Sequence, residues 1–117
     1  MEQRNSDRKA VSLDAVIGCS RFGLIRGRIV DLGYSGLYIS AETSIVPIGA
    51  SVTVTFQPDP DSAAACLNIR GWVAHQSLHG FGVAFGDLDA HCREALDRLL
   101  PAMPPVPNRA VPVLRAI

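Results

Sequence analysis

FGVAFGDLDAHCREALDRLL, residues 81–100, contains the change of periodicity that decides the fold of this chain. In the first part of the segment every second residue is large and apolar, at Phe81, Val83 and Phe85. In the second part apolar residues recur three or four positions apart, at Leu88, Cys92, Leu96 and Leu99. A period of two is typical of a strand with one buried face, and a period of about 3.6 is typical of an amphipathic helix. The segment therefore predicts a strand followed by one helix, whose first turn Asp87 or Asp89 can cap.

Upstream of this segment, the period of two recurs in short stretches that are separated by turn-forming residues. The expected strands are residues 9–19, 22–30, 37–40, 51–56, 66–75 and 81–87. Ser20-Arg21 is the expected tip of the first hairpin, and DLGYSG at residues 31–36 is a turn by composition. Short strands at this spacing favour a barrel or a sandwich. We expect an all-β fold, a six-stranded antiparallel barrel covered by the C-terminal helix.

Length and composition restrict the class of protein. The 117 residues correspond to one domain, and a hydrophobic fraction of 48% is enough for a core. Eleven basic and eleven acidic residues leave no net charge, which argues against a DNA or RNA partner. Residues 1–30 hold six of the basic and three of the acidic residues. Such a basic end suits a small anionic ligand or an acidic partner, although a solvated surface is the commoner explanation.

The cysteines and the apolar runs bear on the cellular compartment. Cys19, Cys66 and Cys92 are odd in number and form no CxxC motif, so a disulfide framework is not expected. MEQRNSDRK at residues 1–9 lacks the apolar core of a signal peptide. No apolar run approaches the roughly 18 residues of a membrane span. We expect a cytoplasmic protein without a membrane span.

The chain divides into three parts by composition. Residues 1–8 form a polar arm with almost no apolar side chain, and residues 9–100 hold the strands and the helix. Residues 101–117 form a tail with five of the eight prolines. Because proline interrupts helices, we expect this tail to be non-helical and extended or mobile.

Two short motifs carry the candidate function. The first is Arg4-Asn5-Ser6-Asp7-Arg8, an Arg-x-x-x-Arg pattern, and the second is Asp31-Leu32-Gly33-Tyr34-Ser35-Gly36. Together, and followed by GFGVAFGDL and a helix, they resemble a PilZ domain over roughly residues 4–100. PilZ domains are bacterial receptors for the second messenger cyclic di-GMP. The serine of the family's Asp/Asn-x-Ser-x-x-Gly motif falls on Gly33, and Ser35 lies two residues later.

The resemblance implies a binding site for cyclic di-GMP at Arg4, Arg8, Asp31, Gly33, Ser35 and Gly36. An arginine fork matches the O6 and N7 acceptors of guanine, and it also stacks on purine faces. A carboxylate at Asp31 would accept hydrogen bonds from guanine N1–H and N2–H. Gly33 and Gly36 would let the backbone approach the ligand or take a positive φ. We expect the arm to be disordered when free and ordered by the ligand.

Other constellations are weaker. His75 and His79 are four apart and His91 adjoins Cys92, but no zinc spacing emerges, so surface histidines are the better interpretation. On such an alternating strand, Trp72 is more often a core or half-buried residue than a stacking platform for a base. No catalytic set is evident, so we expect no enzyme and no cofactor or metal.

Two functions remain open from the sequence. The first is a receptor that binds cyclic di-GMP and passes the signal to an unidentified protein partner. The alternative is an adaptor on the same fold that binds no ligand and acts only through protein–protein interaction. We expect a monomer or a weak dimer in either case.

Overall fold

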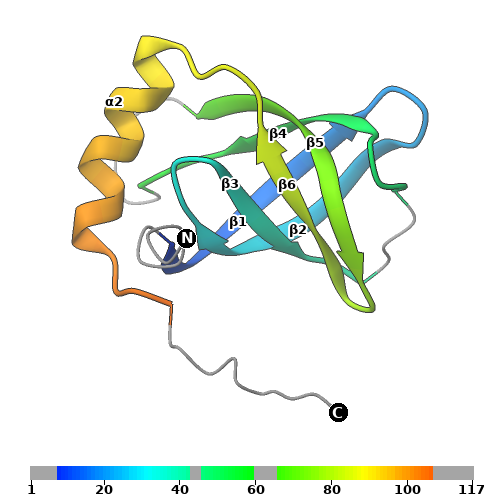
Figure 1. Cartoon of the computed structure of the whole chain (residues 1–117), viewed down its shortest axis with the longest axis horizontal. Helices are drawn as coiled ribbons and strands as arrows, with labels where there is room; N and C mark the ends of the chain where they lie inside the picture. The colour runs from blue at the N-terminus through cyan, green and yellow to red at the C-terminus, as the bar shows by residue number, and fades with distance from the viewer. Residues whose placement is uncertain (1–7, 43–45, 60–65, 107–117) are drawn as a thin grey trace.

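The strands close into a barrel. The computed structural model describes residues 8–42, 46–59 and 66–106 (Figure 1). The strands are β1 (Lys9–Cys19), β2 (Gly23–Leu32), β3 (Gly36–Ser40), β4 (Ser51–Phe56), β5 (Leu67–Ser77) and β6 (Gly80–Phe85). They form a closed antiparallel barrel in the order β1-β2-β3-β6-β5-β4, and the helix α2 (Ala90–Leu99) follows β6. The prediction of a six-stranded antiparallel barrel with one C-terminal helix is confirmed.

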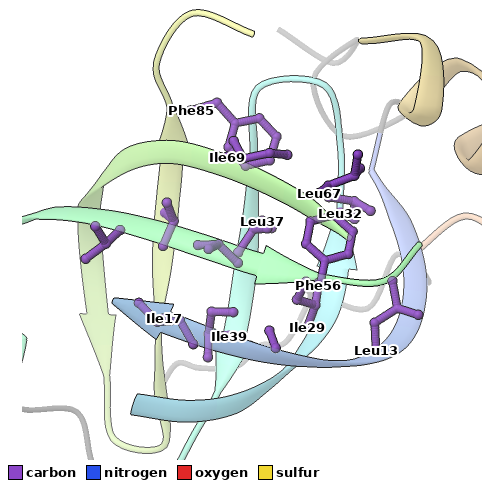
Figure 2. Close-up of a cluster of buried hydrophobic side chains, with 14 of the residues drawn as sticks. Leu13, Ile17, Ile29, Leu32, Leu37, Ile39, Phe56, Leu67, Ile69 and Phe85 are labelled. Atoms are coloured by element: carbon purple, nitrogen blue, oxygen red, sulfur yellow. The ribbon is translucent and has the colours of Figure 1, made fainter. Parts of the chain in front are cut away.

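Alternation along the strands fills the barrel with apolar side chains. In β1 every second residue from Leu13 onward is buried, namely Leu13, Ala15, Ile17 and Cys19. The corresponding residues of the other strands meet them inside the barrel, as Figure 2 shows for Ile29, Leu37, Ile39, Phe56 and Ile69 among others. Each large apolar side chain that is fully buried contributes about 1.5–3 kcal/mol relative to an exposed one. Burial of one face thus sets the strand register, because a shift by one residue would turn every core side chain outward.

The first hairpin turns as the sequence predicts, with one more residue in its loop. Ser20, Arg21 and Phe22 form the turn, and the amide of Phe22 donates to the carbonyl oxygen of Cys19 at 3.1 Å. Gly23 follows with a φ of 79°. A three-residue hairpin loop needs a left-handed residue at this position, which glycine adopts without strain.

The helix α2 covers the end of the barrel at which β2 ends and β3 begins (Figure 1). Asp89 is its N-cap, and the Asp89 carboxylate accepts a hydrogen bond from the amide of Cys92 at 2.8 Å. Cys92 and Leu96 face the core and are buried. Cys92 is therefore a core residue, as its position among the apolar residues of the predicted helix indicates.

The segment after α2 differs from the expected non-helical tail. It begins with one 3-10 turn, Leu100–Ala102, in which Pro101 tolerates the helical geometry because a first-turn residue needs no amide hydrogen. The chain then runs extended beside the start of β1. The amide of Ala10 donates to Pro104 O at 2.8 Å, and the amide of Val106 donates to Arg8 O at 3.2 Å.

Three side chains that the sequence analysis considered are exposed. Trp72 lies on β5 with 46% of its surface exposed, so it is not a core residue. Cys66 is exposed and precedes β5, whereas we predicted it inside that strand. His79 is exposed in the turn between β5 and β6. Within the described ranges, no helix is long and apolar enough to cross a membrane.

Candidate ligand-binding site

Two β-bulges turn site residues toward the outside of the barrel. The pairing register shifts between Ile29 and Asp31 of β2, and again between Val73 and His75 of β5. A bulge adds one residue to one strand and so resets the alternation of its side chains. Consequently neither Asp31 nor His75 is buried, although each lies two residues after a fully buried neighbour.

Beyond the bulges, four paired residues form a row across the outer surface. Asp31 pairs with Tyr38 of β3, Tyr38 pairs with Gly82 of β6, and Gly82 pairs with His75 of β5. Directly opposed residues of antiparallel strands point to the same face of the sheet. The row therefore presents a carboxylate, a phenol ring, a position without a side chain and an imidazole.

An ion pair joins the two sequence motifs. Arg8 immediately precedes β1, and the pairing of Ala10 with Asp31 brings the start of β1 beside the end of β2. The Arg8 Nη2 group donates to the Asp31 carboxylate. Both side chains remain about a quarter exposed, at 28% and 25%, so water and ligands reach them. Arg4 lies outside the described residues.

A pocket of about 330 Å³ lies over this row. Its volume falls at the lower end of the range of roughly 300–1,000 Å³ that is typical of small-molecule sites. Four of the six predicted site residues line it, namely Arg8, Asp31, Ser35 and Gly36. Arg8 of the first motif and three residues of the second motif therefore meet at one concave surface.

The turn between β2 and β3 is built differently from the expectation. The amide of Gly33 donates to Gly36 O at 2.9 Å, and the buried Gly33 does not line the pocket. Neither of these glycines has a positive φ, so that part of the prediction is wrong. Gly36 has a packing reason instead, since a Cβ there would lie 2.5 Å from Val83 O on β6.

The same turn contacts the helix. Tyr34 packs against the core, and its hydroxyl donates to the Asp97 carboxylate of α2 at 2.8 Å. The amide of Phe85 at the end of β6 donates to Ser35 O at 2.9 Å. The turn is therefore held from two sides, and its exposed residue Ser35 lines the pocket.

Tyr38, Gly82 and His75 are among the residues of this pocket that sequence reasoning missed. We predicted His75 as a surface histidine, and it is exposed, but its neighbours were not foreseeable without the strand pairing. One signal was present, because the alternation of β5 stops after Val73 in the letters VAHQ. In the described part of the chain, no group of three His, Cys, Asp or Glu side chains is arranged to hold a metal ion.

A second hollow of about 530 Å³ lies over β1, β2 and β4. It contains Arg26 and Arg28 but none of the predicted site residues. Arg28 already contacts the Ser12 hydroxyl at 2.9 Å and the Asp14 carboxylate at 3.2 Å. The Arg28 and Asp14 side chains of this pair are 55% and 88% exposed, so they are more open to solvent than Arg8 and Asp31. Because the hollow also lacks the predicted site residues, we regard the first pocket as the candidate site.

The fold and the pocket define a small β-barrel module whose polar groups gather on its outer wall and not in its apolar interior. The chain matches the family model of the PilZ domain over residues 2–101 and belongs to that family. PilZ domains are generally modules that bind cyclic di-GMP or act as adaptors, and they are not known as enzymes. A search of curated proteins finds no match to this chain.

Proposed function

We propose that this chain is a receptor that binds cyclic di-GMP in the pocket at Arg8 and Asp31 and does not hydrolyse it. The supporting observation is that strand pairing places the second arginine of the first motif against the aspartate of the second motif. Membership of the PilZ family makes cyclic di-GMP the ligand of choice. A changed surface around the pocket then carries the signal to a protein partner.

The two paired side chains read adjacent edges of one guanine. The Arg8 fork offers two donors in the geometry that matches O6 and N7, and charge-assisted hydrogen bonds of this kind are strong. The Asp31 carboxylate accepts from N1–H and N2–H. Adenine presents neither set, because its six-position carries an amino group and its N1 has no hydrogen. The pocket therefore selects guanine over adenine.

The Arg8–Asp31 ion pair of the free protein holds both groups near the pocket. The ligand exchanges this pair for bonds of similar kind, so its gain is smaller than that of two unpaired charges. In return, the side chains lose little conformational freedom on binding. We assign Arg4 of the preceding arm to the second base or to the phosphates, where a guanidinium is suited to either contact.

Calorimetric titration with cyclic di-GMP, and with cyclic di-AMP beside it, tests the proposal. A micromolar dissociation constant corresponds to about 8 kcal/mol. We expect Arg8→Ala to lose roughly 1.5–3 kcal/mol of binding, and Asp31→Ala to lose binding and also guanine selectivity. Chromatography of the ligand after incubation should recover it intact.

The matched control is Arg28→Ala, which removes an equally charged side chain from the other hollow. It should bind as the parent does. Unfolding temperatures should change little in Arg8→Ala, since the ion pair lies at the surface and a surface ion pair is worth about 0–1 kcal/mol. A marked loss of stability in Arg8→Ala would mean that the residue is structural.

The alternative function, an adaptor that binds no ligand, is favoured by Gly33, which lacks the hydroxyl of the family's motif. Against it, Ser35 supplies a hydroxyl at the edge of the pocket. Absence of a binding heat at millimolar cyclic di-GMP would favour the adaptor and end the receptor proposal.

A further inference from the structure

Two aromatic rings lie close together in the pocket. The residue between them, on the intervening strand β6, is a glycine. Tyr38 on β3 and His75 on β5 both pair with Gly82 on β6. Neighbouring strands lie about 4.8 Å apart, so the Cα atoms of these two residues are separated by roughly 10 Å. Their ring centroids are nevertheless only 6.1 Å apart, and the ring planes are 21° from parallel. Both rings therefore lean over β6.

Gly82 makes this arrangement possible. A Cβ at this position would lie 2.3 Å from Nε2 and 2.5 Å from Cε1 of His75. Any other residue would thus push the imidazole away from β6. Gly82 is thus the one residue of the row without a side chain, and the histidine ring lies over it.

The tyrosine ring is fixed from its far end. Its hydroxyl forms a hydrogen bond with the Ser77 hydroxyl on β5. The tyrosine side chain therefore reaches across β6. Tyr38 is only partly exposed, whereas His75 is exposed. The pair thus combines one anchored ring with one accessible ring, and both line the pocket that also contains Arg8 and Asp31.

We propose that Tyr38 and His75 form an aromatic platform that binds the face of a guanine base whose edges contact Arg8 and Asp31. This inference rests on the proposed function, and neither residue belongs to the two sequence motifs. Hydrogen bonds at the edges of a purine compete with hydrogen bonds to water. An aromatic surface against the purine instead removes the apolar face of the base from water. Stacking of a base on an aromatic side chain is sequence-tolerant and changes affinity by roughly 5- to 150-fold on alanine substitution.

The plain alternative is a cross-strand packing pair that stabilises the barrel and touches no ligand. The two roles differ in what they predict for His75. A packing pair affects unfolding, and a platform affects binding. Because His75 is exposed, its removal should leave the core intact.

Titration of His75→Ala with cyclic di-GMP separates the two roles. We expect binding at least about fivefold weaker than that of the parent, with the unfolding temperature little changed. His75→Phe should restore most of the affinity because it keeps a planar ring. His79→Ala is the matched control, since His79 is exposed but lies outside the pocket. It should bind as the parent does.

Gly82→Ala provides a second variant that keeps both rings but displaces the imidazole. It should weaken binding as His75→Ala does, and the double variant should be no weaker than either single one. Proton NMR of the parent adds a direct readout, because a stacked guanine shifts the ring protons of His75 upfield. Equal affinity of parent and His75→Ala, without such a shift, would overturn the platform and leave the receptor intact. If the parent itself binds no cyclic di-GMP, the proposed function and the platform both fail.

Discussion

Some residues of the β2–β3 turn serve the packing of the barrel, and another offers a polar group to the pocket. Gly36 is required by the close approach of β6, and the amide of Gly33 closes the turn on the Gly36 carbonyl. Ser35 is the residue of this turn that offers a side-chain hydroxyl to the pocket. The family's motif has that hydroxyl two residues earlier. The hydroxyl of the site has therefore moved along the turn, in our interpretation, and has not been lost.

We expect Ser35→Ala to weaken binding of cyclic di-GMP by up to about tenfold, since a neutral hydrogen bond is worth about 0.5–1.5 kcal/mol. Gly33→Ser, which puts a hydroxyl at the position where the family's motif has one, should tighten ligand binding modestly. The backbone at Gly33 is not in the left-handed region, so a serine there meets no strain from φ. Calorimetry on both variants, with unfolding temperatures, measures these effects. A Gly33→Ser protein that folds normally but binds more weakly would contradict the role given to the hydroxyl.

Among the elements, α2 shows how one polar residue fixes where a helix begins. Asp89 accepts the amide of Cys92, and this backbone hydrogen bond holds the pKa of the Asp89 carboxyl below its ordinary value of 3.8. Asp87, the other residue that the sequence offered as a cap, is exposed and precedes the helix. The cap satisfies an amide that the first helical turn leaves without an intrahelical partner.

Asp89→Ala should lower the unfolding temperature by several degrees at neutral pH, while Asp87→Ala, the matched control, should change it little. A carboxyl whose pKa is lowered by folding stabilises the protein above its unfolded pKa, and this contribution is lost as the pH falls through the folded value. The difference between parent and Asp89→Ala should therefore shrink below about pH 4. Thermal unfolding between pH 2 and pH 7 measures it, and a difference that persists at the acid end would speak against the cap.

A second prediction concerns the extended segment beside β1. The amide of Val106 donates to Arg8 O, so this segment holds the backbone of a residue whose side chain lies in the pocket. Val106→Pro removes the donor, whereas Val106→Ala keeps it and serves as control. We expect only the proline variant to lose about 0.5–1.5 kcal/mol of stability and to bind the ligand more weakly. Chemical denaturation and calorimetry provide the measurement, and equal behaviour of the two variants would rule out the coupling.

At the scale of the whole molecule, barrel and helix share one core. The accessibility of the three cysteines shows which of them lie in this core. Cys19 and Cys92 are buried, while Cys66 is exposed. Burial, together with the Asp89 carboxylate, raises the pKa of the Cys92 thiol above its ordinary value of 9.0. The neutral thiol is thus the form that the fold stabilises. Its Sγ lies 3.7 Å from Asn68 O, where the helix meets β5.

Iodoacetamide should therefore modify Cys66 in the native protein, and Cys19 and Cys92 only when the barrel unfolds. The raised pKa has a further consequence, because a group that holds its proton more tightly in the folded state stabilises the protein below its unfolded pKa. This contribution is lost as the pH rises above 9.0 and through the folded value. Cys92→Ala should lose less stability than the parent over this alkaline range. Mass spectrometry and thermal unfolding measure the two effects, and rapid native alkylation of Cys92 would contradict both.

The sequence by itself determined the local structure: the strands, the helix with its two candidate caps, and the two motifs. These features follow from side-chain periodicity and turn chemistry, which act between residues close in the chain. Only the tertiary structure decided which outward side chains meet. The row of Asp31, Tyr38 and His75 depends on strand register and on two bulges, and register is set by burying apolar faces of strands that are far apart in the chain. An extra residue in a bulge changes the alternation of the sequence very little. The aromatic side of the pocket could therefore be recognised only from the closed barrel.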